Sequence, residues 1–332
     1  MRSASDWMKD LSGDLNVTQI SIPGTHNSHA IENNVIADYK TPAILASQAF
    51  YNPALRMAAE IPTKIATCQI DPMWKQLQNG VRFLDLRVRS WEKFDSEGGR
   101  WGFGLCHGPA KLKESLTQVL DGMADFLGNH PSETLLISIK WDEAVLNGLS
   151  PKQTDPDDNL RHGVNEIWNK YGWFKGAHWP KLNEVRGRAI LLRRFWNPPN
   201  ESLGLNFYDP SFYDQERSNG SEGKWKQMPK PDRNALTIAE RWSCARDMLQ
   251  EAKNADFNDG VMYFSTTCDT WFDEKTFQFW VPFYYAQRLN PQLVLFMIDE
   301  CKTPRKGRYG VVITDFCEPD TARSIFEQNF RP

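Results

Sequence analysis

Two histidines stand at the ends of apolar, β-rich runs of the chain. His26 lies in "SIPGTHNSHA", shortly after the run 17–22, and His107 ends the run 102–107. Histidine gains and loses a proton near neutral pH, so two of them make a natural pair of general base and general acid. The plainer alternatives are a polar loop residue for His26 and a hydrogen-bonded core residue for His107. Either histidine alone leaves those alternatives open.

Basic residues lie in or at the ends of three other runs. Arg87 lies in "RFLDLRV", Lys140 ends "TLLISIK" and Arg194 ends "AILLRR". A guanidinium can bind two phosphate oxygens at once, so these residues predict a locally positive phosphate site in a chain of net charge -3. Two histidines beside an arginine and a phosphate are suited to cleave a phosphodiester. One histidine takes the proton of the nucleophile and the other protonates the leaving oxygen.

Acidic residues complete the pattern. Asp85 precedes Arg87 by two residues, Asp315 lies in "YGVVITDF", Glu240 ends "NALTIAE", and Asp269 follows the run 261–267. Asp85 and Asp315 are suited to orient the imidazoles, because a carboxylate holds a histidine in one tautomer. A single charge at a strand end is as often a solvated cap. Charges at most of the strand ends together favour a site.

The elements that must position these residues are eight short runs. Apolar runs of this length are typical of strands buried on both faces of a parallel sheet, and helical patterns at 112–131, 244–255 and 282–302 lie between some of them. We therefore predict an α/β fold, an irregular (β/α)8 TIM-type barrel in one domain spanning 1–332, with its site at the carboxyl ends of the strands. The segments 30–75 and 141–180 are predicted to be insertions at the rim. The eight runs are 17–22, 82–88, 102–107, 134–140, 189–194, 234–240, 261–267 and 309–316.

Composition narrows the class of protein. Of the 332 residues, 40% are hydrophobic and 24% charged, which is typical of a globular chain, and the net charge argues against a nucleic-acid partner. There is neither an apolar run of membrane-spanning length nor an amino-terminal signal pattern. The expected location is therefore cytoplasmic or peripheral at a membrane, or secreted if a signal was removed. The six cysteines form no C-x-x-C pair, so neither a zinc site nor a disulfide framework is predicted.

Seven motifs in this order resemble the phosphatidylinositol-specific phospholipase C family, in its bacterial form with a single X-type barrel domain. The resemblance spans nearly the whole chain. It implies that His26 deprotonates the inositol 2-hydroxyl, that His107 protonates the departing diacylglycerol, and that Arg87 stabilises the phosphate, giving a 1,2-cyclic inositol phosphate. The motifs are "SIPGTHNS", "VRFLDLRVR", "LCHG", "SETLLISIKWDE", "VRGRAILLRRF", "LTIAERW" and "YGVVITDF".

The resemblance also implies roles for the flanking residues. Asp315 would orient the base and Asp85 would belong to the catalytic set. The inositol ring would be held by Lys140, Arg194, Glu240 and Trp242. The last two replace the Asp and Tyr that are usual in this family.

Two departures from the family pattern bear on metals. Asn27 stands where the metal-independent bacterial enzymes have an Asp that assists the general acid, and the metal-dependent eukaryotic enzymes also have His-Asn there. Those eukaryotic enzymes bind calcium through acids on the second strand, and Arg87 occupies the second of these positions. A guanidinium fills the place of the cation and repels it, so no metal cofactor is expected.

A phospholipid substrate implies peripheral contact with a membrane surface. Trp271, in "CDTWFDEKTFQFW", is the candidate interface residue, because tryptophan favours the lipid–water boundary. The alternative for Trp271 is a packed loop residue. We expect a monomer.

Two other functions compete with this interpretation. A glycerophosphodiester phosphodiesterase would use a similar barrel but needs a metal-binding Glu-x-Asp on the second strand, which "LDLR" lacks. A non-catalytic barrel that binds phosphoinositides or glycans would need neither His26 nor His107.

Overall fold

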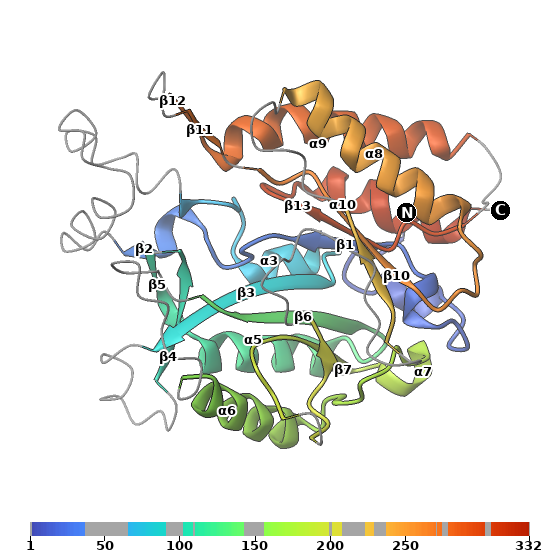
Figure 1. Cartoon of the computed structure of the whole chain (residues 1–332). Helices are drawn as coiled ribbons and strands as arrows, with labels where there is room; N and C mark the ends of the chain where they lie inside the picture. The colour runs from blue at the N-terminus through green and yellow to red at the C-terminus, as the bar shows by residue number, and fades with distance from the viewer. Residues whose placement is uncertain are drawn as a thin grey trace.

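A curled sheet with helices on both sides forms the molecule (Figure 1). In the described part of this computed structural model, eleven strands belong to one sheet and two more form a separate hairpin. The structure describes residues 2–36, 66–90, 102–108, 110–142, 156–198, 201–207, 223–228, 237–269, 271–273, 278–302 and 307–331.

Parallel strands make up the body of the sheet, in the order β8-β7-β6-β3-β1-β13-β10-β9. Because these strands all run the same way, their carboxyl ends lie at one end of the curled sheet, where barrels of this class build their sites. Their bounds are β1 Ile22–Thr25, β3 Phe83–Ser90, β6 Thr134–Trp141, β7 Arg188–Arg194, β8 Leu205–Asn206, β9 Trp225–Gln227, β10 Met262–Thr266 and β13 Val311–Thr314.

An antiparallel branch grows from β3. Strand β4 (Phe103–His107) pairs with β3, β5 (Ala110–Ser115) pairs with β4, and β2 (Val35–Ile36) pairs with β5. In the β3–β4 register Val88 lies opposite Leu105. Strand β4 therefore runs back along β3 and carries His107 toward Arg87.

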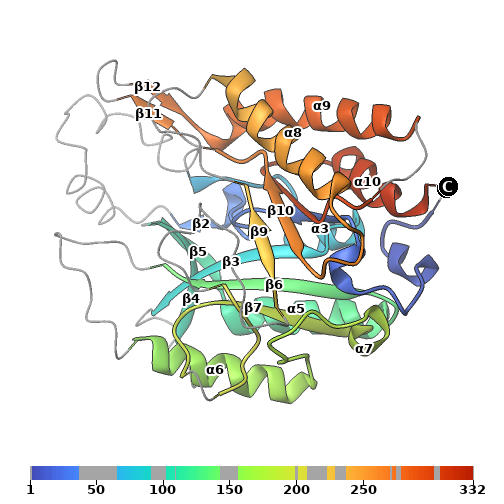
Figure 2. The same cartoon turned by 45° about the vertical axis from the view of Figure 1, so that its right-hand side comes forward.

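Helices cover the sheet from two sides. In Figures 1 and 2, α5 and α6 lie on one side, and α8, α9 and α10 lie on the other. No helix in the described part of the chain is both long and apolar enough to cross a membrane. The helices are α3 Met73–Gln78, α5 Leu116–Asn129, α6 Pro156–Tyr171, α7 Leu182–Val185, α8 Ile238–Asn254, α9 Pro282–Glu300 and α10 Pro319–Phe326, with 3-10 turns at Trp7–Asp10, Val17–Gln19, Glu32–Asn34 and Glu327–Phe330.

The central strands are buried on both faces, as their unbroken apolar sequences predict. Leu135, Leu136, Ile137 and Ile139 of β6 are fully buried. Alternate side chains of β6 join two different core clusters, one of which includes residues of α5 and α6. The predicted α/β barrel is confirmed, as an incomplete and irregular one. The prediction of one domain over the whole chain stays a prediction.

Two of the predicted strands are wrong in position or kind. Within 17–22, residues Val17–Gln19 form a 3-10 turn capped by Asn16, so β1 begins only at Ile22 and includes Pro23 and Gly24. The run 234–240 is helical from Ile238 on, because Thr237 and Glu240 form a reciprocal capping box at the start of α8.

Other predictions need smaller corrections. The run 102–107 is a strand, but an antiparallel one. The predicted helix 112–131 begins only at Leu116, after β5. The supposed insertion 141–180 holds α6, the crossover helix between β6 and β7, and 30–75 holds β2 and the start of α3. Strands β8 and β9 were not predicted. The ranges 37–65, 91–101, 143–155 and 229–236 lie outside the described residues.

Candidate active site

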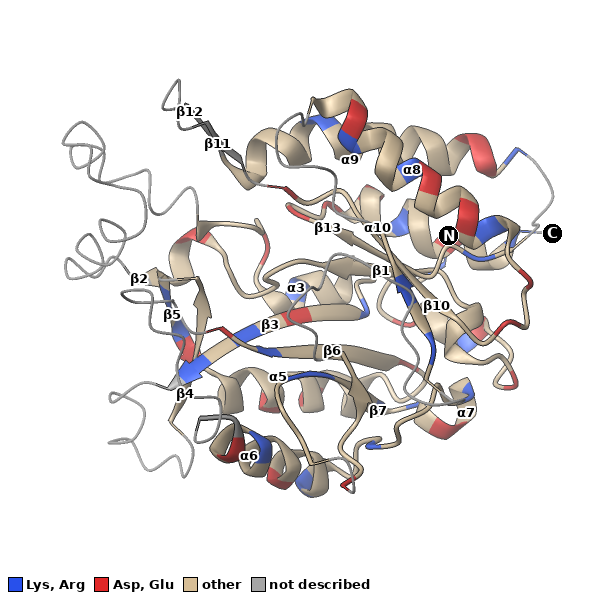
Figure 3. Cartoon of the chain, in the orientation of Figure 1, with Lys and Arg blue, Asp and Glu red and all other residues tan. Residues whose placement is uncertain are grey.

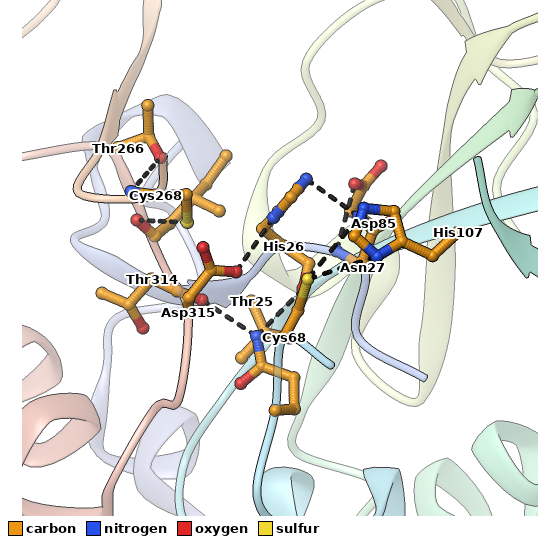
Figure 4. Close-up of polar contacts among 12 residues, drawn as sticks. Thr25, His26, Asn27, Cys68, Asp85, His107, Thr266, Cys268, Thr314 and Asp315 are labelled. Carbon is orange, nitrogen blue, oxygen red and sulfur yellow. Dashed lines mark hydrogen bonds and ion pairs between the residues drawn. The ribbon is translucent and has the colours of Figure 1, made fainter. Parts of the chain in front are cut away.

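His26 and Asp315 meet because β1 and β13 are neighbours in register. Thr25 pairs with Thr314, and each functional residue follows its strand directly. The His26 Nδ1 and Asp315 Oδ1 atoms lie 2.9 Å apart, and Asp315 is only 1% exposed (Figure 4). The strand pairing thus brings together two groups that lie 289 positions apart in the chain.

Arg87 fixes which nitrogen of His26 carries the proton. A terminal nitrogen of the guanidinium lies 2.8 Å from His26 Nε2. Arginine can only donate, so Nε2 accepts and Nδ1 carries the hydrogen that is donated to Asp315. The side-chain amide of Asn27 also donates to Nε2, at 3.0 Å. His26 is therefore held as a neutral imidazole with the lone pair of Nε2 facing the cationic side of the site, as a general base requires.

The turns after β1 and β13 both use left-handed backbone. Asn27 has φ 41° and Phe316 has φ 49°. Asparagine tolerates this region, whereas it strains a bulky aromatic residue, and such strain is concentrated at functional sites. Hydrogen bonds hold both turns. The backbone N–H of Asn27 donates to Asp85 Oδ2 at 3.2 Å, and the backbone N–H of Phe316 donates to the Cys68 carbonyl at 2.7 Å.

Asp85 is the buried anion that organises the basic side chains. Its Oδ1 accepts from Arg194 at 3.1 Å and from Ser138 at 3.4 Å, while its Oδ2 faces Arg87 Nε at 3.5 Å. Burial alone would raise the pKa of this carboxyl. Arg87, Arg194 and His26 outweigh burial and lower it to about 2. Asp85 is therefore ionised at neutral pH and holds both guanidinium groups toward the same space.

His107 lies across the site from His26. The centroids of the two rings are 6.0 Å apart and their planes are nearly perpendicular. His107 Nδ1 lies 2.9 Å from the Ala66 carbonyl, which can only accept, so Nδ1 carries a hydrogen and Nε2 is left for the reaction. Burial, followed by the charges of Arg87 and His26, lowers the pKa of His107 to about 4. The free protein therefore holds a neutral His107 at pH 7.

Asp142 is a residue of this site that the sequence analysis did not single out. Its Oδ1 accepts from Lys140 Nζ at 2.9 Å, and its Oδ2 lies 3.5 Å from Arg87. Burial opposes ionisation, but Arg87 and Lys140 keep the pKa of Asp142 well below its usual range. Burial and Arg87 in turn lower the pKa of Lys140. The sequence could have indicated Asp142, because side chains alternate between the two faces of a strand such as β6, so residues 140 and 142 lie on the same face.

The structure does not bring all the predicted ring-binding residues together. Lys140 and Arg194 lie side by side, paired in register on β6 and β7. In contrast, Glu240 is exposed at the start of α8, where its carboxylate accepts from Thr237. Trp242 packs against Phe296 of α9, with 6.0 Å between their rings. Both were expected at a strand end, and the helix directs them into a cap and a helix–helix contact instead.

Two further candidates lie near the strand ends. Asp269, just after β10, forms an ion pair with Arg241 at 3.3 Å. Trp271 begins β11 (Trp271–Asp273), which forms an antiparallel hairpin with β12 (Gln278–Trp280). In Figure 1 this hairpin stands away from the main sheet. The interfacial role of Trp271 stays a prediction.

The site as a whole combines two histidines with a cluster of alternating charges. Figure 3 shows an acidic segment followed by basic segments along β3. Arg87 lies at the centre of the cluster, within 3.5 Å of His26, Asp85 and Asp142. This arrangement can position an anion against Arg87 between a proton acceptor and a proton donor.

Known proteins were compared with the whole chain. No family model matches it. A 1-phosphatidylinositol phosphodiesterase of Listeria monocytogenes is 23% identical over 334 residues, covering 98% of this chain and 86% of the relative. One of Staphylococcus aureus is 22% identical, covering 95% and 89%. A PI-PLC X domain-containing protein 1 of Danio rerio is 29% identical, covering 68% and 64%.

Solved structures give the same result for the fold. The phosphatidylinositol-specific phospholipase C of L. monocytogenes superimposes with a TM-score of 0.68, at 20% identity, covering 98% of this chain and 99% of the other. An S. aureus enzyme of the same name superimposes with a TM-score of 0.70, covering 98% of each chain. The chain is similar over nearly its whole length to the bacterial phosphatidylinositol-specific phospholipases C. The resemblance carried by the seven motifs is therefore confirmed.

Proposed function

We propose that the chain is a phospholipase C that cleaves phosphatidylinositol into diacylglycerol and a 1,2-cyclic inositol phosphate. The observation that carries this proposal is the contact of His26 with both Asp315 and Arg87, with His107 across the site. The similarity to bacterial 1-phosphatidylinositol phosphodiesterases supports the same reaction.

The proposed reaction is an internal displacement at phosphorus. His26 Nε2 takes the proton of the inositol 2-hydroxyl, and that oxygen forms a bond to the phosphorus. The bond from phosphorus to the glycerol oxygen breaks, and His107 gives this oxygen a proton, releasing diacylglycerol. Asp315 stabilises the His26 imidazolium formed on the way.

Arg87 supports the transition state in this proposal. Its guanidinium is held by Asp85 and Asp142 and donates to His26 in the free protein. A bound phosphate would take over those donors, and the Asn27 side-chain amide, which also donates to His26 Nε2 in the free protein, must give way to the substrate hydroxyl, so that the lone pair of His26 can take its proton. Stabilisation of the oxygen charge by such a donor is worth about 3–4 kcal/mol in comparable sites.

Lys140 and Arg194 are the proposed contacts to the inositol ring. They lie opposite each other on β6 and β7, beside Arg87 on β3. Glu240 and Trp242 have no part in this proposal, because the one caps a helix and the other packs between helices.

The membrane surface is part of the proposed function. One solved S. aureus structure concerns modulation of that enzyme's membrane binding. We propose that this chain also binds a bilayer surface peripherally, with Trp271 of the β11–β12 hairpin as a contact. The monomeric state stays a prediction.

Phosphorus NMR of the products tests the reaction directly. Purified protein is incubated with phosphatidylinositol vesicles in EDTA, and we expect the signal of a cyclic inositol phosphodiester. His26→Ala serves as the inactive control. Release of a glycerophosphate from a soluble glycerophosphodiester, without a cyclic product, would instead support the glycerophosphodiester phosphodiesterase. Binding of the lipid with no product would support the non-catalytic barrel.

A further inference from the structure

Three different metal-ligating groups meet beside the catalytic pair. Strands β1, β13 and β10 are neighbours, with Thr25 paired to Thr314 and Thr266 paired to Ile313. One or two residues beyond these pairs lie His26, Asp315 and Cys268. An imidazole nitrogen, a carboxylate oxygen and the thiol sulfur of these residues all lie within 4.8 Å of one another (Figure 4).

Asp315 has an oxygen that the catalytic arrangement does not use. Its Oδ1 accepts the hydrogen of His26 Nδ1, but Oδ2 is buried and has no hydrogen-bond partner among the residues that the structure describes, and the residue is only 1% exposed. A buried acceptor left without a partner costs about 1–3 kcal/mol. This atom therefore has unused capacity to bind a proton donor or a cation.

Cys268 is held in place but weakly bonded through its sulfur. Its backbone N–H donates to Thr266 Oγ1 at 3.0 Å, which fixes the turn after β10. Its thiol lies 3.7 Å from the Ile313 carbonyl, a weak contact, and the residue is buried and free of any disulfide. The thiol thus faces the base and its carboxylate without a strong competing bond.

We propose that His26, Cys268 and Asp315 form an inhibitory binding site for a borderline divalent cation of the Zn²⁺ type. Imidazole, thiolate and carboxylate are the three ligand classes that zinc takes in proteins, and three protein ligands leave a fourth position for water or a phosphate oxygen. The site differs in kind from a calcium site beside Arg87, because calcium takes oxygen ligands. A sequence search for short cysteine spacings misses it, since its ligands come from three strands.

Binding of the cation removes the base. The cation takes the Nδ1 lone pair of His26, so the hydrogen of Nδ1 moves to Nε2, and the thiol proton of Cys268 is released to solvent. Nε2 then carries a hydrogen and cannot accept a proton from the substrate. It also faces the Arg87 guanidinium, which lies 2.8 Å away in the free protein and can only donate. Binding of the cation does not depend on the proposed function, whereas the inhibition rests on that function.

Cobalt absorption tests the site without any substrate. Co²⁺ is added to the full-length protein after EDTA treatment and removal of the chelator. We expect a thiolate-to-cobalt charge-transfer band that added Zn²⁺ abolishes. Cys268→Ser should lose the band, whereas Cys68→Ser, which changes another buried thiol of the same region, should keep it. Absence of the band in the wild type, or its persistence in Cys268→Ser, would overturn the proposal.

Inhibition of lipid cleavage is the second measurement. Zn²⁺ should inhibit the wild type, and EDTA should restore its activity. Cys268→Ser should keep its activity in EDTA and need at least about tenfold more Zn²⁺ for half-inhibition, because losing a ligand costs no less than losing an outer-shell partner. Equal zinc sensitivity of wild type and variant, or activation by zinc, would contradict the inhibitory role. Cys268→Ala and thermal unfolding show whether either variant fails to fold. If the chain cleaves no phosphatidylinositol at all, the proposed function fails while the cobalt band still decides the site.

Discussion

Asp85→Asn is predicted to destabilise the protein in a way that depends on pH. The carboxylate is buried at 4% exposure and faces Arg87 and Arg194 together. The asparagine amide keeps the size of the side chain and loses the charge. Two guanidinium groups then face each other in the site without the anion that separates them. Removing one partner of a buried ion pair costs about 3–5 kcal/mol in general.

The pKa of Asp85 gives a lower figure for the same loss. A carboxyl whose pKa falls from 3.8 when unfolded to about 2 when folded stabilises the native state by about 2 kcal/mol at neutral pH. Because the folded pKa is the lower one, this contribution is present above pH 4 and is lost as the pH falls toward 2. By pH 3 about 1 kcal/mol of it is gone. We take about 2 kcal/mol as the expected difference at pH 7, since Arg87 is partly exposed and solvent screens it.

Urea unfolding of the wild type and Asp85→Asn at pH 7 and pH 3 measures the difference in their free energy of unfolding. The free energy of unfolding should differ by about 2 kcal/mol at pH 7, and by about half of that at pH 3. Asp299→Asn is the control, because within the described part of the chain Asp299 pairs with Lys302, both side chains are exposed, and the change should give no pH-dependent difference. A difference that is equal at the two pH values would show that the charge of Asp85 is not what stabilises the fold.

Three further predictions concern activity. His26→Ala or His107→Ala should each lower kcat/KM at least about 10²-fold, and near-wild-type turnover by His26→Ala would exclude the proposed mechanism. Trp271→Ala should weaken vesicle binding in a sedimentation assay and spare a soluble inositol phosphodiester; equal loss on both substrates would point away from a membrane role. Wild-type activity should not change with EDTA or calcium. Arg87→Asp should lose most activity in EDTA and regain part of it with millimolar calcium. If EDTA inactivates the wild type and calcium restores its activity, Arg87 does not act as the built-in cation.

The parts of the fold that the sequence predicts are those in which one signal dominates. The strands β6 and β7 are mainly apolar runs and β3 begins with apolar residues that then alternate with charged ones, and no competing pattern overlaps them. Strands β8 and β9 have two and three residues, too few for periodicity to show. At 234–240 two signals compete. The apolar run favours a strand, but Thr237 and Glu240 are the N-cap and N3 residues of a capping box, and the helix prevails.

The site was predictable where it depends on strand ends and not where it depends on register. Parallel strands bring their carboxyl ends together whatever their order, so His26, Arg87 and Asp315 were expected to meet. Which of them touch is set by pairing. A closed barrel already implies that its last strand, β13, lies between β1 and β10, but sequence patterns do not reveal the register that brings Cys268 to Asp315.

The protonation of His107 shows how binding and chemistry are linked in the proposed mechanism. A general acid must carry a proton, yet burial, Arg87 and His26 lower the pKa of His107 to about 4 in the free protein. A phosphodiester anion against Arg87 offsets the charge that disfavours the imidazolium, and the Ala66 carbonyl and Asp142 already favour it. Asn27 is uncharged and contributes nothing of this kind. In the proposed mechanism the negative charge of the bound substrate therefore raises the pKa of His107 and favours its protonated form, so the acid gains its proton more readily when the site is filled.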